Sequence, residues 1–162
     1  MYIQQADLFW GMNRDFVKEI MDTSEKETCQ KGTLLFQQGD PAKYFYILVK
    51  GRVRLIVGKS GPVVQTVDHA GEAFGWSSLI DRDVYSASAE CTEPTTLQKF
   101  DRHLFHKILE KDSANGLIFF KRFAGLIGYR LIRSYQMATS GSIAEGAPSF
   151  GTEQVEESEA AA

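Results

Sequence analysis

The stretch that decides the fold is Gly71-Glu72-Ala73-Phe74-Gly75-Trp76-Ser77-Ser78-Leu79, followed by Tyr85-Ser86-Ala87-Ser88-Ala89. Two glycines frame its first part, and a short helical turn is expected to begin at the second. Glycine lets the backbone approach a ligand closely, and a helix start offers free N–H groups to an anion. A strand of small residues follows. This layout predicts a loop that binds phosphate.

Short segments rich in β-branched and aromatic residues surround this loop. The spacing of apolar residues changes from the helical period at Gly32 and changes again at Asp101. Turn residues such as Gly39-Asp40-Pro41 separate the segments. Many short strands at this spacing predict a mainly β fold, an antiparallel sandwich or barrel. The expected strands are residues 33–37, 44–49, 53–57, 63–68, 86–91 and 96–100.

Helices are expected on both sides of the strands. Apolar residues recur at helical spacing over residues 5–21, after which a polar loop over residues 23–31 leads to the first strand. A short helix is expected over residues 102–110, with Asp101 as its N-cap.

A longer helix is expected over residues 113–137, with Asp112 or Ser113 as its N-cap. Residues 139–162 contain five glutamates, no lysine or arginine, and few apolar residues. They are predicted to form an acidic disordered tail. One domain, residues 1–138, would then account for the ordered part of the chain.

The composition excludes several classes of protein. The two cysteines lack the spacing of a metal or iron–sulfur site. No apolar stretch approaches the roughly 20 residues of a membrane-spanning helix, and no signal peptide is evident. The expectation is a cytoplasmic protein without membrane association.

Three patterns resemble the cyclic nucleotide-binding domain family: the loop at residues 71–89, the strand and turn at 31–40, and the strand–glycine–strand segment at 44–53. The resemblance implies an antiparallel β-roll, or double-stranded jelly roll, over residues 32–100. It also implies an N-terminal helix and C-terminal short and long helices. The implied ligand is a cyclic nucleotide or another small anion.

The loop departs from the family at the two positions that carry charge. Trp76 stands where the family has a glutamate for the ribose, and Tyr85 stands where it has an arginine for the phosphate. Weak or absent binding of cyclic AMP and cyclic GMP is therefore expected. An alternative register uses Glu72 and Arg82. The resemblance assigns the ligand-binding residues as Phe74, Gly75, Trp76, Ser77, Ser78, Tyr85, Ser86 and Ala87.

Several of these residues have a structural interpretation as well. Trp76 can fill the pocket instead of stacking on a ligand, and Ser77 and Ser78 can cap the short helix instead of binding an anion. His69, His103 and His106 lack the arrangement of a metal site. No catalytic constellation is recognisable, so an enzyme is not expected.

The remaining expectations concern partners. The long helix at residues 113–137 is apolar around too much of its circumference to pack on one sheet, which predicts a homodimer. Too few residues follow it for the helix-turn-helix domain of the family's regulators, so DNA binding is not expected. Two hypotheses remain: a sensor of a small anionic ligand, and a module that binds no ligand and acts through dimerisation or docking.

Overall fold

The structure is a computed structural model that describes residues 7–140. The chain divides into two compact units, Met1–Ala124 and Gly125–Ala162. The first unit contains every strand and the helices that flank them, and the last long helix crosses the boundary between the units. Each unit is described by itself.

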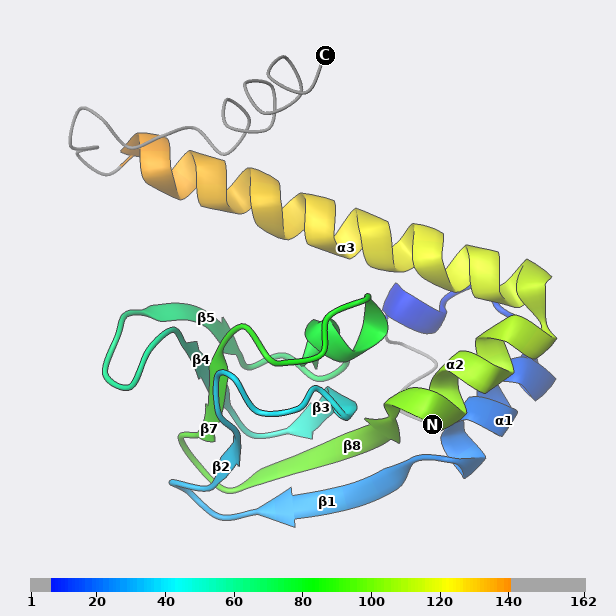
Figure 1. Cartoon of the computed structure of the whole chain (residues 1–162), viewed down its shortest axis with the longest axis horizontal. Coiled ribbons are helices and arrows are strands. Elements are labelled where there is room, and N and C mark those ends of the chain that lie inside the picture. Colours follow the sequence, from blue (N-terminus) through cyan, green and yellow to red (C-terminus); the bar gives the residue numbers. More distant parts are fainter. Residues whose placement is uncertain (1–6, 141–162) are drawn as a thin grey trace. The chain divides into compact units, whose positions relative to one another are not determined.

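The strands form two antiparallel sheets of four strands each (Figure 1). The order in the first sheet is β1 (Glu25–Cys29), β8 (Thr95–Asp101), β3 (Tyr44–Lys50) and β6 (Ala73–Phe74). The order in the second sheet is β2 (Leu34–Phe36), β7 (Ser88–Cys91), β4 (Val53–Ile56) and β5 (Val63–Val67). The prediction of an antiparallel β-roll with flanking helices is confirmed.

Buried and half-buried side chains alternate along the strands, and this pattern explains how the two sheets pack face to face. In β4, Val53 and Leu55 are buried while Arg54 and Ile56 are half-buried on the outer side. The inward side chains of both sheets form one apolar cluster, as a two-layer β fold requires. Its buried members are Cys29, Phe36, Ala42, Tyr46, Leu48, Val53, Leu55, Val67, Phe74, Tyr85, Ala89, Cys91 and Leu97.

Two strands were not predicted from the sequence. β1 lies within the segment that was expected to be a loop, because its pattern is polar except at Cys29. Among the described strands it is the edge of its sheet and pairs with β8 alone, and most of its side chains face solvent. β6 is two residues long and pairs with β3, too short to show an alternation.

The N-terminal helix is confirmed, but its predicted bounds, residues 5–21, are wrong. A single 3-10 turn, η2 (Asp7–Phe9), is separated from α1 (Arg14–Asp22), and residues 5 and 6 lie outside the described residues. Gly11 breaks the helix with a φ of 79°. Asn13 then caps α1, since its side chain accepts a hydrogen bond from the Asp15 N–H.

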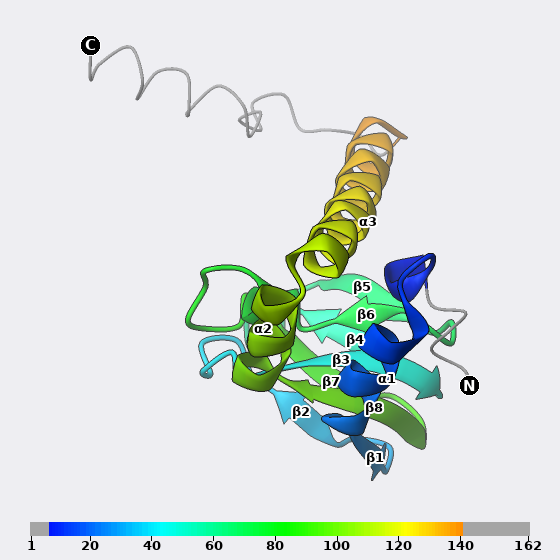
Figure 2. The same ribbon diagram turned by 90° about the vertical axis from the view of Figure 1, so that its right-hand side faces the viewer.

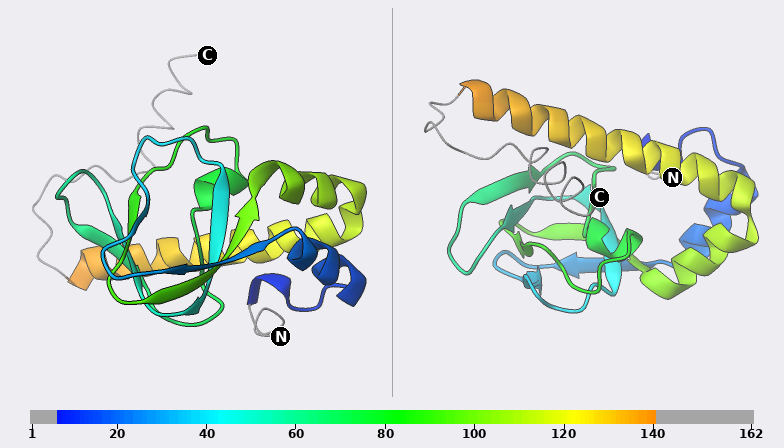
Figure 3. Two further views of the ribbon diagram at one scale, coloured as in Figure 1. Left: turned by 90° about the horizontal axis from the view of Figure 1, so that it is seen from below. Right: turned by 45° about the horizontal axis from the view of Figure 1, so that its top comes forward.

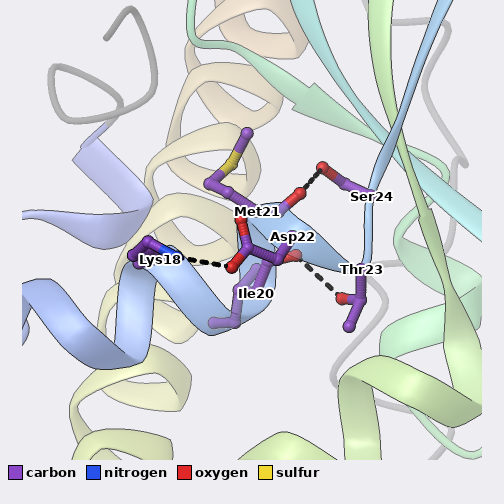
Figure 4. Close-up of polar contacts among 6 residues, drawn as sticks. All are labelled: Lys18, Ile20, Met21, Asp22, Thr23 and Ser24. Atoms are coloured by element: carbon purple, nitrogen blue, oxygen red, sulfur yellow. Dashed lines mark hydrogen bonds and ion pairs between the residues drawn. The ribbon is translucent and has the colours of Figure 1, made fainter.

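The end of α1 is closed by the side chains of the two residues that follow it (Figure 4). The Thr23 hydroxyl donates to the Ile20 carbonyl at 2.8 Å, and the Ser24 hydroxyl donates to the Met21 carbonyl at 2.6 Å. These bonds satisfy two carbonyls that have no partner within the helix. The Lys18–Asp22 ion pair adds a contact on the exposed side, and the chain turns from there into β1.

Two helices follow the strands. α2 (Arg102–Lys111) begins at the predicted N-cap, because the Asp101 carboxylate accepts from the N–H groups of His103 and Leu104. Within the first unit α2 lies beside α1, and Figures 1 and 2 show both helices at the same end of the roll. An ion pair between Lys111 and Glu19, at 3.0 Å, joins them.

The long helix α3 (Ser113–Ser140) begins where predicted and ends three residues later than predicted. The Asp112 carboxylate accepts from the Asn115 N–H at 3.1 Å and caps it. Within the first unit, Phe119 and Phe123 are buried. The helix includes residues 139 and 140 of the expected tail, and the rest of that tail lies outside the described residues.

Candidate ligand pocket

The quoted loop forms the expected turn from strand to short helix. Strand β6 ends at Phe74, Gly75 follows, and the 3-10 helix η3 (Trp76–Leu79) begins directly after it. Gly75 has a φ of 76°, and a Cβ at this position would lie 3.1 Å from the Tyr44 carbonyl oxygen. Both the backbone angle and the close approach require glycine here.

The two serines of η3 are buried and do not cap it. Gly75 occupies the N-cap position, so the interpretation of Ser77 or Ser78 as the N-cap is wrong. The Ser78 hydroxyl instead donates back to the Gly75 carbonyl at 2.9 Å. This bond closes the turn and engages the hydroxyl that was a candidate for an anion.

Helix η3 lies beside α2, as the two views of Figure 3 show. The His106 ring nitrogen Nε2 lies 3.3 Å from the Ser78 carbonyl oxygen. The Arg102 guanidinium donates to the Arg82 carbonyl at 2.8 Å and to the Ile80 carbonyl at 3.3 Å. Two side chains of α2 therefore contact backbone carbonyls of η3 and of the loop after it.

Tyr85 occupies the interior of the site. It is 4% exposed, and its ring stacks on Phe36 with centroids 3.7 Å apart. Its hydroxyl accepts from the Tyr44 N–H at 3.0 Å and donates to the Tyr44 carbonyl. Burial raises the pKa of Tyr85 to about 12, so the phenol is neutral near pH 7 and supplies no charge to a ligand.

The space left between these groups is small. Six of the predicted ligand-binding residues line one hollow with a volume of about 20 Å³, which is space for roughly one water molecule. Pockets for drug-sized ligands measure about 300–1,000 Å³. The lining residues are Phe36, Leu55, Gly75, Trp76, Ser77, Tyr85, Ser86 and Ala87.

The hollow differs from the predicted set at four positions. Phe74 and Ser78 do not line it, because Phe74 stacks on Tyr46 in the core and Ser78 closes the turn. Phe36 and Leu55 line it and were not predicted. Side chains alternate between the two faces of a strand, and both residues lie at inward-facing positions of strands next to the loop. That alternation is the sequence signal that could have found them.

The residues of the alternative register lie elsewhere. The Glu72 carboxylate accepts from the N–H groups of Asp68 and His69, at 3.0 and 2.9 Å, and so holds the turn before β6. Arg82 is exposed in the loop after η3. Neither lines the hollow.

Asp68, His69 and Glu72 form the one group of potential metal ligands found among residues 7–140, with ligand atoms within 4.8 Å of one another. The group lies at the surface, and its Glu72 carboxylate already binds two backbone N–H groups.

A wider hollow of about 420 Å³ lies elsewhere on the surface, beside Lys59 and the outward-facing pair Ile56 and Ser88. Over the described range of the chain, no helix is long and apolar enough to cross a membrane.

The structure is thus an antiparallel β-roll of two four-stranded sheets, with a glycine at the start of a short helix beside its pocket. A family model for the cyclic nucleotide-binding domain matches residues 26–112. The chain belongs to this family.

Its relatives include a regulatory subunit of a protein kinase and a bacterial receptor. A cAMP-dependent protein kinase regulatory subunit of Yarrowia lipolytica is 30% identical over 107 residues, covering 63% of this chain and 26% of the subunit. The cyclic AMP receptor protein of Thermus thermophilus is 33% identical over 94 residues, covering 57% of this chain and 44% of the receptor. The chain thus spans less than half of either relative.

Solved structures show the same fold. A cyclic nucleotide-binding domain from Methylobacillus flagellatus superposes with a TM-score of 0.77 at 22% identity, over 90% of this chain and 83% of the other. The Thermus thermophilus catabolite activator protein superposes with a TM-score of 0.67 at 24% identity, over 82% and 62%. At these identities the likeness concerns the fold alone.

Proposed function

We propose that the chain is a regulatory, non-catalytic module of signal transduction whose β-roll binds cyclic AMP and cyclic GMP weakly or not at all. The observation that carries this proposal is the stacked pair of Tyr85 and Phe36, which leaves about 20 Å³ in the pocket. Trp76 and Tyr85 also lack the charges that would bind the ribose and the phosphate. A neutral phenol loses the charge-assisted bidentate bond that an arginine makes with a phosphate.

Isothermal titration calorimetry with cyclic AMP and cyclic GMP tests the proposal. The wild-type chain is expected to give no heat of binding at low-micromolar ligand. The double variant Trp76→Glu, Tyr85→Arg places the two charges and removes the stacked ring, and it is expected to gain affinity. Tyr135→Arg is the matched control for added charge, because Tyr135 is 54% exposed on α3. Low-micromolar affinity of the wild type would overturn the proposal.

A small anion other than a cyclic nucleotide is the second candidate ligand. A thermal-shift series with cyclic dinucleotides, phosphate and sulfate separates the two hypotheses, because a ligand that binds only the native state must raise the melting temperature. A concentration-dependent rise with one of these anions would favour a sensor. No rise with any of them favours a module that acts through its protein contacts.

The protein contact that we propose is a homodimer through α3. The helix buries Phe119 and Phe123 within the first unit, while Leu117 and Phe120 are 58% and 38% exposed. Leu117, Phe120, Ala124, Ile127 and Leu131 recur at the spacing of a single helix face. A contiguous apolar face of this length is typical of a helix that packs against a partner.

A further inference from the structure

The two cysteines of the chain lie at one corner of the β-roll. Cys29 ends β1 in the first sheet, and Cys91 ends β7 in the second. Two connections cross between the sheets here. After β1 the chain returns so that the Gly32 N–H donates to the Cys91 carbonyl at 2.7 Å, and the Cys91 N–H donates to the Thr33 carbonyl at 2.9 Å.

The second connection reaches the same corner from the other side. The turn after β7 leads into β8, where Thr95 is the cross-strand partner of Cys29. Cys91 is therefore only one short turn away from the residue that faces Cys29. The backbone alone places both cysteines where the two sheets meet, although they are far apart in the sequence.

Both side chains point into the same apolar cluster. Cys29 is 6% exposed and Cys91 is fully buried, and both belong to the core between the sheets. The Cys29 thiol donates to the Glu27 carboxylate at 3.7 Å, and each thiol affects the pKa of the other. The backbone bonds of Cys91 to Gly32 and Thr33, close to Cys29 in the sequence, place the two cysteines at the same corner of the fold.

We propose that Cys29 and Cys91 form a reversible intramolecular disulfide that joins the two sheets when the protein meets a peroxide. One thiolate attacks a peroxide oxygen and becomes a sulfenic acid, while the second oxygen leaves as water. The sulfur of the other cysteine then displaces water from the sulfenic acid and forms the S–S bond. Two thiols lose two electrons and two protons, and hydrogen peroxide is reduced to two molecules of water.

The reaction is slow in the closed roll and is controlled by β1. Burial raises the pKa of both thiols, that of Cys29 to about 11, so few thiolates exist near pH 7. Strand β1 is the edge of its sheet and pairs only with β8. Local opening of this edge exposes Cys29 without unfolding the inner strands, and edge elements open at lower free energy than the core.

The bond would act on the pocket as well as on the corner. Phe36 and Tyr85, which close the pocket, belong to the same cluster as the two cysteines. Phe36 lies on β2, the strand that directly follows the connection from Cys29. A disulfide would hold that connection against β7 and make separation of the two sheets less favourable in the oxidised protein.

The test is treatment of the full chain with hydrogen peroxide, followed by mass spectrometry under non-reducing conditions. The expected product is a monomer lighter by two hydrogen atoms, with a peptide that links Cys29 to Cys91 and disappears with a reductant. Its melting temperature is expected to rise by about 5 to 15 °C, and to fall back on reduction. Cys29→Ser and Cys29→Ala are the matched controls, and neither should show the linked peptide or the rise.

Two results would overturn the proposal. One is a wild-type protein whose two thiols still react with a thiol reagent in denaturant after peroxide treatment. The other is oxidation that yields only sulfinic acid or disulfides between chains. Both are read from the wild-type protein itself, so the conclusion does not depend on whether a cysteine variant folds.

Discussion

The ring of Tyr85 lies on the ring of Phe36, with centroids 3.7 Å apart and 12° between their planes. The same tyrosine binds both backbone groups of Tyr44 through its hydroxyl. One side chain therefore lines the pocket and joins the loop before β7 to the start of β3. The closed pocket is part of what stabilises the roll, because opening it breaks these contacts.

The first prediction concerns the hydroxyl of Tyr85. Tyr85→Phe keeps the stacked ring but leaves the N–H and carbonyl of Tyr44 without this partner. A buried polar group without a partner costs about 1–3 kcal/mol, so the free energy of unfolding should fall by that amount. Urea denaturation measures it. The control Tyr129→Phe removes a hydroxyl from a side chain that is 61% exposed and should change stability by less than about 0.5 kcal/mol.

A second prediction concerns alkaline pH. Burial raises the pKa of Tyr85 from 10.0 to about 12 in the folded protein. Above pH 10 the unfolded chain loses this proton first, so the stability that the neutral phenol contributes is complete below pH 10 and is lost as the pH rises towards 12. The urea midpoint of the wild type should therefore fall between pH 10 and pH 12. Tyr85→Phe should fall less, and an equal fall in both proteins would contradict the assignment.

The fold could be predicted because its signals are local and repeated. Alternating strands, turn residues and the glycine-framed loop at Gly71 and Gly75 each specify the same roll. β1 was missed because all its side chains except that of Cys29 are polar. Apolar and polar residues therefore do not alternate along it, as they do along a strand with one buried face. The break at Gly11 was missed because apolar periodicity continues across it, and a positive φ is a property of the backbone.

The candidate site was only partly predictable. The loop positions came from sequence, and six of them line one hollow. The volume of that hollow depends on Phe36 and Leu55, which reach it from β2 and β4. Whether Tyr85 would point inward and close the pocket depended on the Tyr44 backbone, which is brought next to it only by the folded sheets.

A third prediction tests the proposed dimer by charge. Ile127→Arg places a cation in the middle of the face that begins at Leu117. Burying an unpaired charge is strongly unfavourable, so the variant should be a monomer. Gln136→Arg is the matched control, because it lies on the opposite side of α3 by helical spacing. Light scattering at high micromolar concentration measures the mass, and a wild-type monomer would contradict the dimer.

The last prediction uses the two glycines of α3 to separate a packed helix from a solvated one. A Cβ built at Gly125 or Gly128 meets no atom within 4 Å, so alanine at either position creates no clash within one chain. Glycine in a helix costs about 1 kcal/mol relative to alanine. The double variant Gly125→Ala, Gly128→Ala should therefore be more helical by circular dichroism when the protein is dilute and monomeric.

The same two methyl groups have the opposite effect on the proposed dimer. Small residues let two helices approach closely, and added methyl groups at a close contact force them apart. The double variant should thus dissociate at a higher protein concentration than the wild type, while its helicity is higher. Sedimentation equilibrium gives the two dissociation constants. Tighter association of the variant would show that a partner helix does not approach α3 at Gly125 and Gly128, and the dimer would have to use another part of the chain.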